Sequence, residues 1–202
     1  MKNLILLIFI FSLNVISFGQ NEPQRQIKTL AGNQKISHGG YGAFSIYYSK
    51  INGENALLVG GKGGWVINHR LTLGLAGYGF VNDLEVNYFD DKKGMNLSGG
   101  YGGLLIEPII MPYELVHLTV PVLIGAGGIT YFDNNWWKDH IYPSKAFFVF
   151  EPGIELELNI IKFMRIGLGI SYRITSDIGI DNMKSKNLDA LSGGISFKFG
   201  RF

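Results

Sequence analysis

The sequence predicts an all-β fold, an up-and-down antiparallel β-barrel of about eight strands. From Gly39 onward, apolar residues alternate with small or polar ones in stretches of about ten residues, which is the period of a strand. Glycine contributes 28 of the 202 residues and aromatic residues 13%, whereas charged residues contribute only 17%. This composition is typical neither of collagen nor of a disordered chain, and the length suits one domain.

The alternation is clearest over 164–175, where Arg165, Ser171 and Arg173 lie opposite a face of apolar side chains. Weaker or interrupted versions of the pattern recur along the chain. Further strands are expected over 39–50, 55–68, 70–81, 96–109, 116–125, 148–158 and 190–201.

The predicted connections alternate between short and long. Short ones are expected at 68–70, 110–114 and 159–163, and longer polar ones at 81–95, 131–145 and 176–189. The connection 50–55 departs from this rule, because it is short where a long one is expected. Tight turns at one end and longer loops at the other are typical of a barrel that spans a membrane, and strands of this length suit a bilayer.

The N-terminus predicts a secretory signal peptide over 1–19. Lys2 precedes an unbroken apolar run, and Ser17 and Gly19 place small residues before a cleavage site at Gln20. The alternative is an uncleaved anchor, although the apolar stretch is short for a spanning helix. We expect a polar leader over 20–38 and the barrel domain over 39–202. The sequence contains no cysteine, which excludes disulfides and thiolate-bound metals.

Alternation alone does not say which face of the barrel is wet. The polar face consists mainly of glycine and serine with a few charges of both signs, which suits a crowded interior better than a solvated exterior. The apolar face suits lipid. Glu157 and Arg165 flank a short turn symmetrically, so they are expected to be cross-strand partners. The predicted interior charge network, with a structural role, comprises Lys62, Glu107, Glu151, Glu155, Glu157, Arg165, Arg173 and Lys198.

Glycines are unusually dense in two predicted strands. We expect tight curvature and a narrow interior to explain Gly60, Gly61, Gly63, Gly64, Gly99, Gly100, Gly102 and Gly103. Trp136 and Trp137 fall in a predicted long loop, where they are expected to lie at the membrane interface or to contact a surface ligand.

With this pattern and the C-terminal sequence FKFGRF, the chain resembles the small eight-stranded outer-membrane β-barrel proteins of Gram-negative bacteria. The resemblance covers about Gly39 to Phe202. It implies an outer-membrane location, contact with outer-membrane lipid, and recognition of the last strand, ending at Phe202, by the barrel-assembly machinery. Phe197 and Phe199 are out of phase with Phe202, which departs from the recognition pattern. The family includes adhesins, anchors, pores and a few enzymes, so membership does not define a function.

No catalytic, cofactor-binding or metal-binding constellation stands out in the sequence, and no basic cluster predicts nucleic-acid binding. His117 shares a face with Thr119, but no serine has the spacing that a lipid hydrolase needs. Asp139 and His140 resemble the acid–base pair of outer-membrane proteases. The leading hypothesis is a non-enzymatic barrel with a structural or surface-interaction role. The alternatives are a small pore, a membrane-embedded enzyme acting on lipid or peptide, and a soluble lipocalin-like ligand binder.

Overall fold

The computed structural model describes residues 36–51, 54–82, 95–133, 144–178 and 188–202. The predicted signal peptide, nearly all of the predicted leader, Trp136, Trp137 and the Asp139–His140 pair lie outside these residues. No helix within the described ranges is long and apolar enough to cross a membrane. The strands are β1 (His38–Ile51), β2 (Glu54–Ile67), β3 (Leu71–Asn82), β4 (Met95–Ile110), β5 (Val116–Thr119), β6 (Val122–Asp133), β7 (Lys145–Ile161), β8 (Met164–Thr175) and β9 (Ala190–Arg201).

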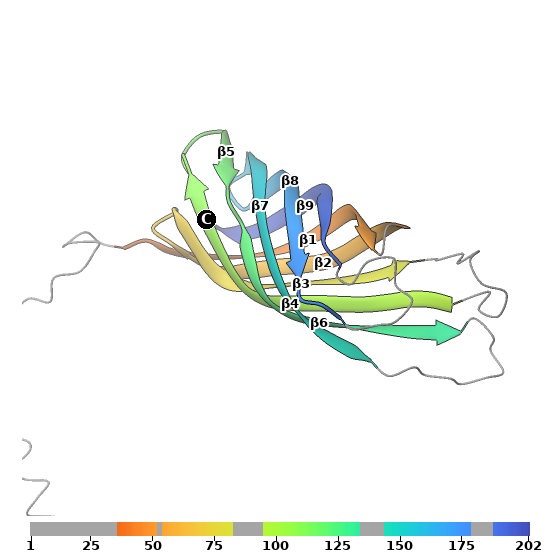
Figure 1. Cartoon of the computed structure of the whole chain (residues 1–202). Coiled ribbons are helices and arrows are strands. Elements are labelled where there is room, and N and C mark those ends of the chain that lie inside the picture. Colours follow the sequence, from red (N-terminus) through yellow and green to blue (C-terminus); the bar gives the residue numbers. More distant parts are fainter. Residues whose placement is uncertain (1–35, 52–53, 83–94, 134–143, 179–187) are drawn as a thin grey trace, which may run out of the picture. The chain divides into compact units, whose positions relative to one another are not determined.

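The strands form one closed antiparallel sheet. Consecutive strands pair along the chain, and β1 pairs with β9, so the sheet closes into a barrel (Figure 1). β5 and β6 together form a single strand of this barrel, because both pair with β4 and β7 in an unchanged register. The two are separated at Val120 and Pro121, where proline cannot donate a ladder hydrogen bond. The nine labelled strands therefore make the eight-stranded, up-and-down barrel that the sequence predicted.

Three short connections lie at one end of the barrel, which we call the short-turn end, whereas the short β1–β2 connection lies at the other end. The three are the β2–β3, β4–β5 and β7–β8 turns, and the first residue of β1 and the last of β9 also lie at the short-turn end. Asn68 and His69 have φ of 53° and 59°. Both residues are therefore in the left-handed conformation, which suits the two-residue turn of a tight hairpin. The opposite end, which we call the long-connection end, carries the connections that include 83–94, 134–143 and 179–187.

The outward face is apolar, as the sequence predicted. Leu75, Leu104, Phe148, Leu168 and Leu191 are each more than 60% exposed, and many other large apolar side chains share this face. Such an extensive apolar exterior is not compatible with water but matches the hydrocarbon of a bilayer. Inward positions alternate with these, which places the predicted charged residues in the interior, here called the lumen.

The glycines occupy two different environments, and this corrects the sequence-based explanation. Lumen-facing Gly60 and Gly103 leave no room for a side chain, since an added Cβ would lie 2.1 Å and 2.2 Å from neighbouring carbonyl oxygens. Gly77 is on the outward face, where the nearest atom to such a Cβ would be 3.6 Å away. By their alternation with exposed residues, half of the glycines assigned to a narrow lumen face outward. These are Gly61, Gly63, Gly100 and Gly102.

Candidate functional site

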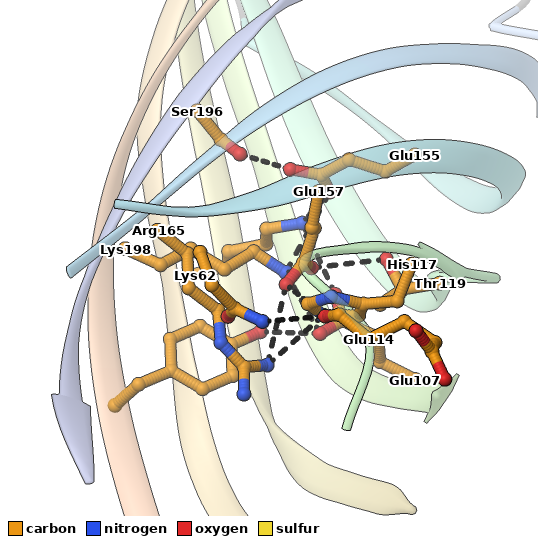
Figure 2. A network of polar contacts seen from close by, with 12 residues as sticks. Lys62, Glu107, Glu114, His117, Thr119, Glu155, Glu157, Arg165, Ser196 and Lys198 are labelled. Atoms are coloured by element: carbon orange, nitrogen blue, oxygen red, sulfur yellow. Dashed lines mark hydrogen bonds and ion pairs between the residues drawn. The ribbon is translucent and has the colours of Figure 1, made fainter. Parts of the chain in front are cut away.

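The lumen contains a compact ionic cluster near the short-turn end. Six of the eight predicted charged residues meet there, and Figure 2 shows their side chains converging from different strands. We call this group the lumen ion cluster. Its members are Lys62 on β2, Glu107 on β4, Glu155 and Glu157 on β7, Arg165 on β8 and Lys198 on β9.

Two lysines hold the three carboxylates together. Lys62 Nζ donates to Glu107 Oε2 at 3.1 Å and also donates to Glu155 Oε2. Lys198 Nζ donates to Glu107 Oε1 at 2.9 Å, donates to Glu157 Oε1, and lies 3.7 Å from Glu155 Oε2. Each lysine thus bridges strands that are not neighbours in the sheet. The ionic cluster therefore ties opposite walls of the barrel across its interior.

Arg165 completes the charge balance of the lumen ion cluster. Its Nη1 atom lies 3.4 Å from Glu157 Oε2, so the predicted pair of Arg165 and Glu157 does come together. Three cations then face three carboxylates, all of them at most 6% exposed. Buried charges are costly unless they are paired and hydrogen-bonded, and this arrangement meets both conditions.

Neutral side chains add further hydrogen bonds to the three carboxylates. The Tyr41 hydroxyl donates to Glu107 Oε1 at 2.9 Å, and the Thr119 hydroxyl donates to Glu157 Oε1 at 3.1 Å. Ser196 donates to Glu155 Oε1. The sequence prediction did not include these residues, although all three share the inward phase of the charged positions. The alternation of inward and outward positions along each strand could therefore have identified them from the sequence.

His117 lies at the edge of the same cluster and is almost completely buried. Its Nε2 atom is 3.1 Å from Glu157 Oε2 and 3.1 Å from Arg165 Nη1, while its Nδ1 atom has no hydrogen-bond partner among the described residues. The nearby hydroxyl, on Thr119, is already bound to Glu157. His117 is therefore enclosed by charged side chains, with only 1% of its surface exposed and no path for a substrate.

The carboxylates of Glu107, Glu155 and Glu157 bring oxygen atoms within 4.8 Å of one another, a spacing that could hold a metal ion. The ammonium groups of Lys62 and Lys198 contact these same oxygens. Since the lysines already neutralise the carboxylates, the geometry favours an all-protein ion cluster over a metal centre.

Arg173 and Glu151, the other two predicted charged residues, lie apart from the lumen ion cluster. Arg173 is fully buried toward the long-connection end, where Nε donates to the Leu188 carbonyl and Nη2 to the Lys50 carbonyl, each at 2.9 Å. It thereby fastens the end of β1 to the segment before β9. Glu151 accepts a hydrogen bond of 2.5 Å from the Ser171 hydroxyl.

An apolar cluster fills the lumen toward the long-connection end. Its side chains come from six strands and from two residues within the β8–β9 connection. Ile178 and Leu188, in that connection, are at most 4% exposed and pack into the apolar cluster at the long-connection end. Sequence analysis missed this layer, because it assigned apolar side chains to the lipid face. Its members include Ile51, Leu58, Phe80, Ile129, Phe147, Val149, Ile178 and Leu188.

The C-terminal residue covers the opposite end of the lumen. The Phe202 ring stacks on Tyr41 with centroids 5.8 Å apart, and the Arg165 guanidinium carbon lies 3.8 Å from the centre of the same ring. Phe202 therefore turns inward, whereas Phe199 faces outward. The lumen is filled in layers, with an aromatic contact at the short-turn end, then the ion cluster, then the apolar cluster.

Comparison with solved structures identifies the same fold in small outer-membrane proteins. The attachment invasion locus protein Ail of Yersinia pestis, solved with the heparin analogue sucrose octasulfate, shares 11% identity at a TM-score of 0.51. The match covers 83% of this chain and 99% of that one. Neisserial surface protein A shares 10% identity at a TM-score of 0.50, with the same coverage of 83% and 99%. No protein-family model and no curated protein matches the sequence. The chain thus has the fold of the small eight-stranded outer-membrane β-barrels.

Proposed function

We propose that this outer-membrane β-barrel is a closed, non-enzymatic anchor that presents its long connections at the cell surface for structural or interaction roles. The observation that carries the proposal is the filled lumen. Charged residues near the short-turn end are paired with one another, and the long-connection end is packed with apolar side chains. A lumen of this kind stabilises a scaffold and does not provide a path for solutes.

The filled lumen argues against the pore alternative. The lumen cavity lined by Lys62, Tyr78 and Glu151 has a volume of about 30 Å³, which holds no more than about one or two water molecules. Purified protein in a planar lipid bilayer should therefore produce no conductance steps, while a porin added to the same bilayer should. Reproducible steps from this chain would replace the anchor proposal with a channel.

The enzyme alternative requires an accessible catalytic group, and His117 is not accessible. His117 is enclosed beside Glu157 and Arg165, so a substrate in the membrane does not reach it. His117→Ala should leave the lipid composition and proteolytic activity of the outer membrane unchanged. An altered lipid A or phospholipid profile in cells carrying this variant, with the barrel still assembled, would favour an enzyme.

Membrane location and orientation are tested together. The protein should pellet with outer membranes and migrate faster on SDS gels when unboiled, as a closed barrel does. An epitope tag inserted within 134–143 should be labelled on intact cells. A tag in the β4–β5 turn, at Pro112, should be labelled only after the outer membrane is permeabilised. Release of the protein without detergent would favour the soluble binder instead.

We also propose that the barrel-assembly machinery reads the last strand before the barrel closes. Phe197 and Phe199 lie on the lipid-facing side, whereas Phe202 packs against Tyr41 of the first strand. Phe202 is free for recognition only before β1 and β9 pair. Phe202→Ala should then slow assembly in cells more than Phe163→Ala, an exposed aromatic in the β7–β8 turn. Equal assembly rates for the two variants would contradict this proposal.

A further inference from the structure

A small polar cavity lies in the lumen between the lumen ion cluster and the apolar cluster. It measures about 30 Å³, and polar side chains from five strands reach its wall. They are Tyr47 on β1, Lys62 on β2, Tyr78 on β3, Glu151 on β7 and Ser171 on β8. Apolar residues complete the lining. Ala76 and Leu105 face the lumen, whereas Ile154 and Ile170 belong to the outward face, so the cavity reaches the barrel wall between β7 and β8. This cavity volume is larger than the roughly 10–15 Å³ that one water molecule requires.

Glu151 brings an unsatisfied atom to this cavity. The residue is only 7% exposed, and its Oε1 atom accepts the Ser171 hydroxyl. Its Oε2 atom is buried and accepts no hydrogen bond of standard geometry among the described residues, although the Tyr101 hydroxyl lies near the Glu151 carboxylate. A carboxylate oxygen in this condition is unfavourable, and buried polar groups in proteins are usually satisfied by a protein group or by an ordered water.

Lys62 offers a donor on the other side of the cavity. Its ammonium group has three N–H bonds. The structure gives it two carboxylate acceptors, Glu107 and Glu155, so one N–H remains for a further acceptor. The Tyr47 and Tyr78 rings meet edge to face at 5.7 Å beside it, which directs two phenol groups to the same region.

We propose that this cavity is a binding site for ordered water that joins Glu151 to the lumen ion cluster. Water both donates and accepts, so it can donate to Glu151 Oε2 and accept from Lys62 or a tyrosine hydroxyl. A bare cation in the same place would meet the Lys62 ammonium group, and an anion would meet Glu151. Water therefore suits the mixed lining better than either ion. The bridge would connect β7 to β2 across the lumen.

The most direct test is a crystal structure of the full barrel at a resolution that shows ordered water. Density should lie within hydrogen-bond distance of Glu151 Oε2 and of Lys62 Nζ or a tyrosine hydroxyl. A cavity without density would overturn the proposal. Density whose neighbours are all oxygen atoms at metal-ligand distances would also overturn it, because it would indicate a bound cation. A urea midpoint of unfolding that changes when sodium is exchanged for choline in the buffer would overturn it for the same reason.

A double-mutant cycle gives an independent test in solution. Ala76→Val places methyl groups in the cavity, so it should displace the water, strand Glu151 Oε2 and lower the urea midpoint of unfolding. In a Glu151→Met background, the same Ala76→Val change should be neutral or should raise the midpoint. If Ala76→Val lowers the midpoint equally in both backgrounds, the damage is overpacking and the water bridge is wrong. If it raises the midpoint in the unmodified protein, the cavity is dry.

Discussion

The guanidinium of Arg165 lies over the ring of Phe202, with 3.8 Å between its central carbon and the ring centre. The other guanidinium contacts of Arg165 are with Glu157 and His117. The last residue of the chain is thus joined through one arginine to the lumen ion cluster. Tyr41, at the start of the barrel, stacks on the same ring, so Phe202 links the first and last strands at their junction.

Phe202→Ala should therefore lower the stability of the folded barrel. Loss of a partly desolvated cation–π contact and an aromatic pair predicts a cost of about 1–3 kcal/mol. The measurement is urea unfolding in detergent micelles or lipid vesicles, followed by tryptophan fluorescence. Phe199→Ala provides the matched control, since Phe199 is 48% exposed on the outward face. A larger loss for Phe199→Ala would mean that the Phe202 contacts contribute little.

The lumen ion cluster predicts strong coupling between Lys198 and Glu157. Lys198→Met or Glu157→Gln alone leaves the buried cluster of three cations and three carboxylates with one uncompensated charge, and each should destabilise the barrel by about 3–5 kcal/mol. The double variant should cost clearly less than the sum of the two single variants, because both charges have gone. Equilibrium unfolding of all four proteins measures this coupling. Additive costs would indicate that the pair does not interact in the folded barrel.

The sequence was sufficient to predict the strands and the facing of the charged residues. A period of two puts Glu155 and Glu157 on one side of β7, and the apolar face opposite assigns that side to the lumen. Within one hairpin, the inward phase of Glu157 and Arg165 on either side of the turn was enough to predict that they pair. The register places Glu157 opposite Gly167 and Arg165 opposite Asn159, so the ion pair is diagonal. These inferences depend only on local geometry, which can be deduced from the alternation of residues along a strand.

Contacts across the lumen could not be predicted in the same way. Lys62 on β2 meets Glu107 on β4 and Glu155 on β7, and which residues lie at one level depends on the tilt and stagger of the closed barrel. The apolar inward layer was also hidden. Where Leu57 and Leu58 are both apolar, alternation does not distinguish the lipid side from the lumen side, although Leu58 is 1% exposed and Leu57 53%.

The facing of β8 predicts a depth-dependent penalty for charge on the outward surface. Leu168 is 61% exposed and lies near the middle of its strand, so Leu168→Arg should cost about 2–4 kcal/mol in lipid vesicles. Tyr113 lies in a short turn beyond the strands and is 74% exposed. Tyr113→Arg should therefore change the stability by less than about 1 kcal/mol. Equal penalties at the two sites in vesicle unfolding would contradict the membrane-facing assignment.

Gly103 and Gly77 predict opposite effects of a single methyl group. Lumen-facing Gly103 has a neighbouring carbonyl oxygen 2.2 Å from the place of a Cβ, so Gly103→Ala should cost about 1–3 kcal/mol or more and reduce the heat-shifted folded band on gels. Outward Gly77 has only ordinary van der Waals contacts around that position, with its nearest atom at 3.6 Å. Gly77→Ala should stabilise the barrel by about 0.4–1 kcal/mol, because alanine restricts the unfolded chain and introduces no clash. If Gly77→Ala were instead as damaging as Gly103→Ala, Gly77 would have to contact something in the membrane that the isolated barrel lacks.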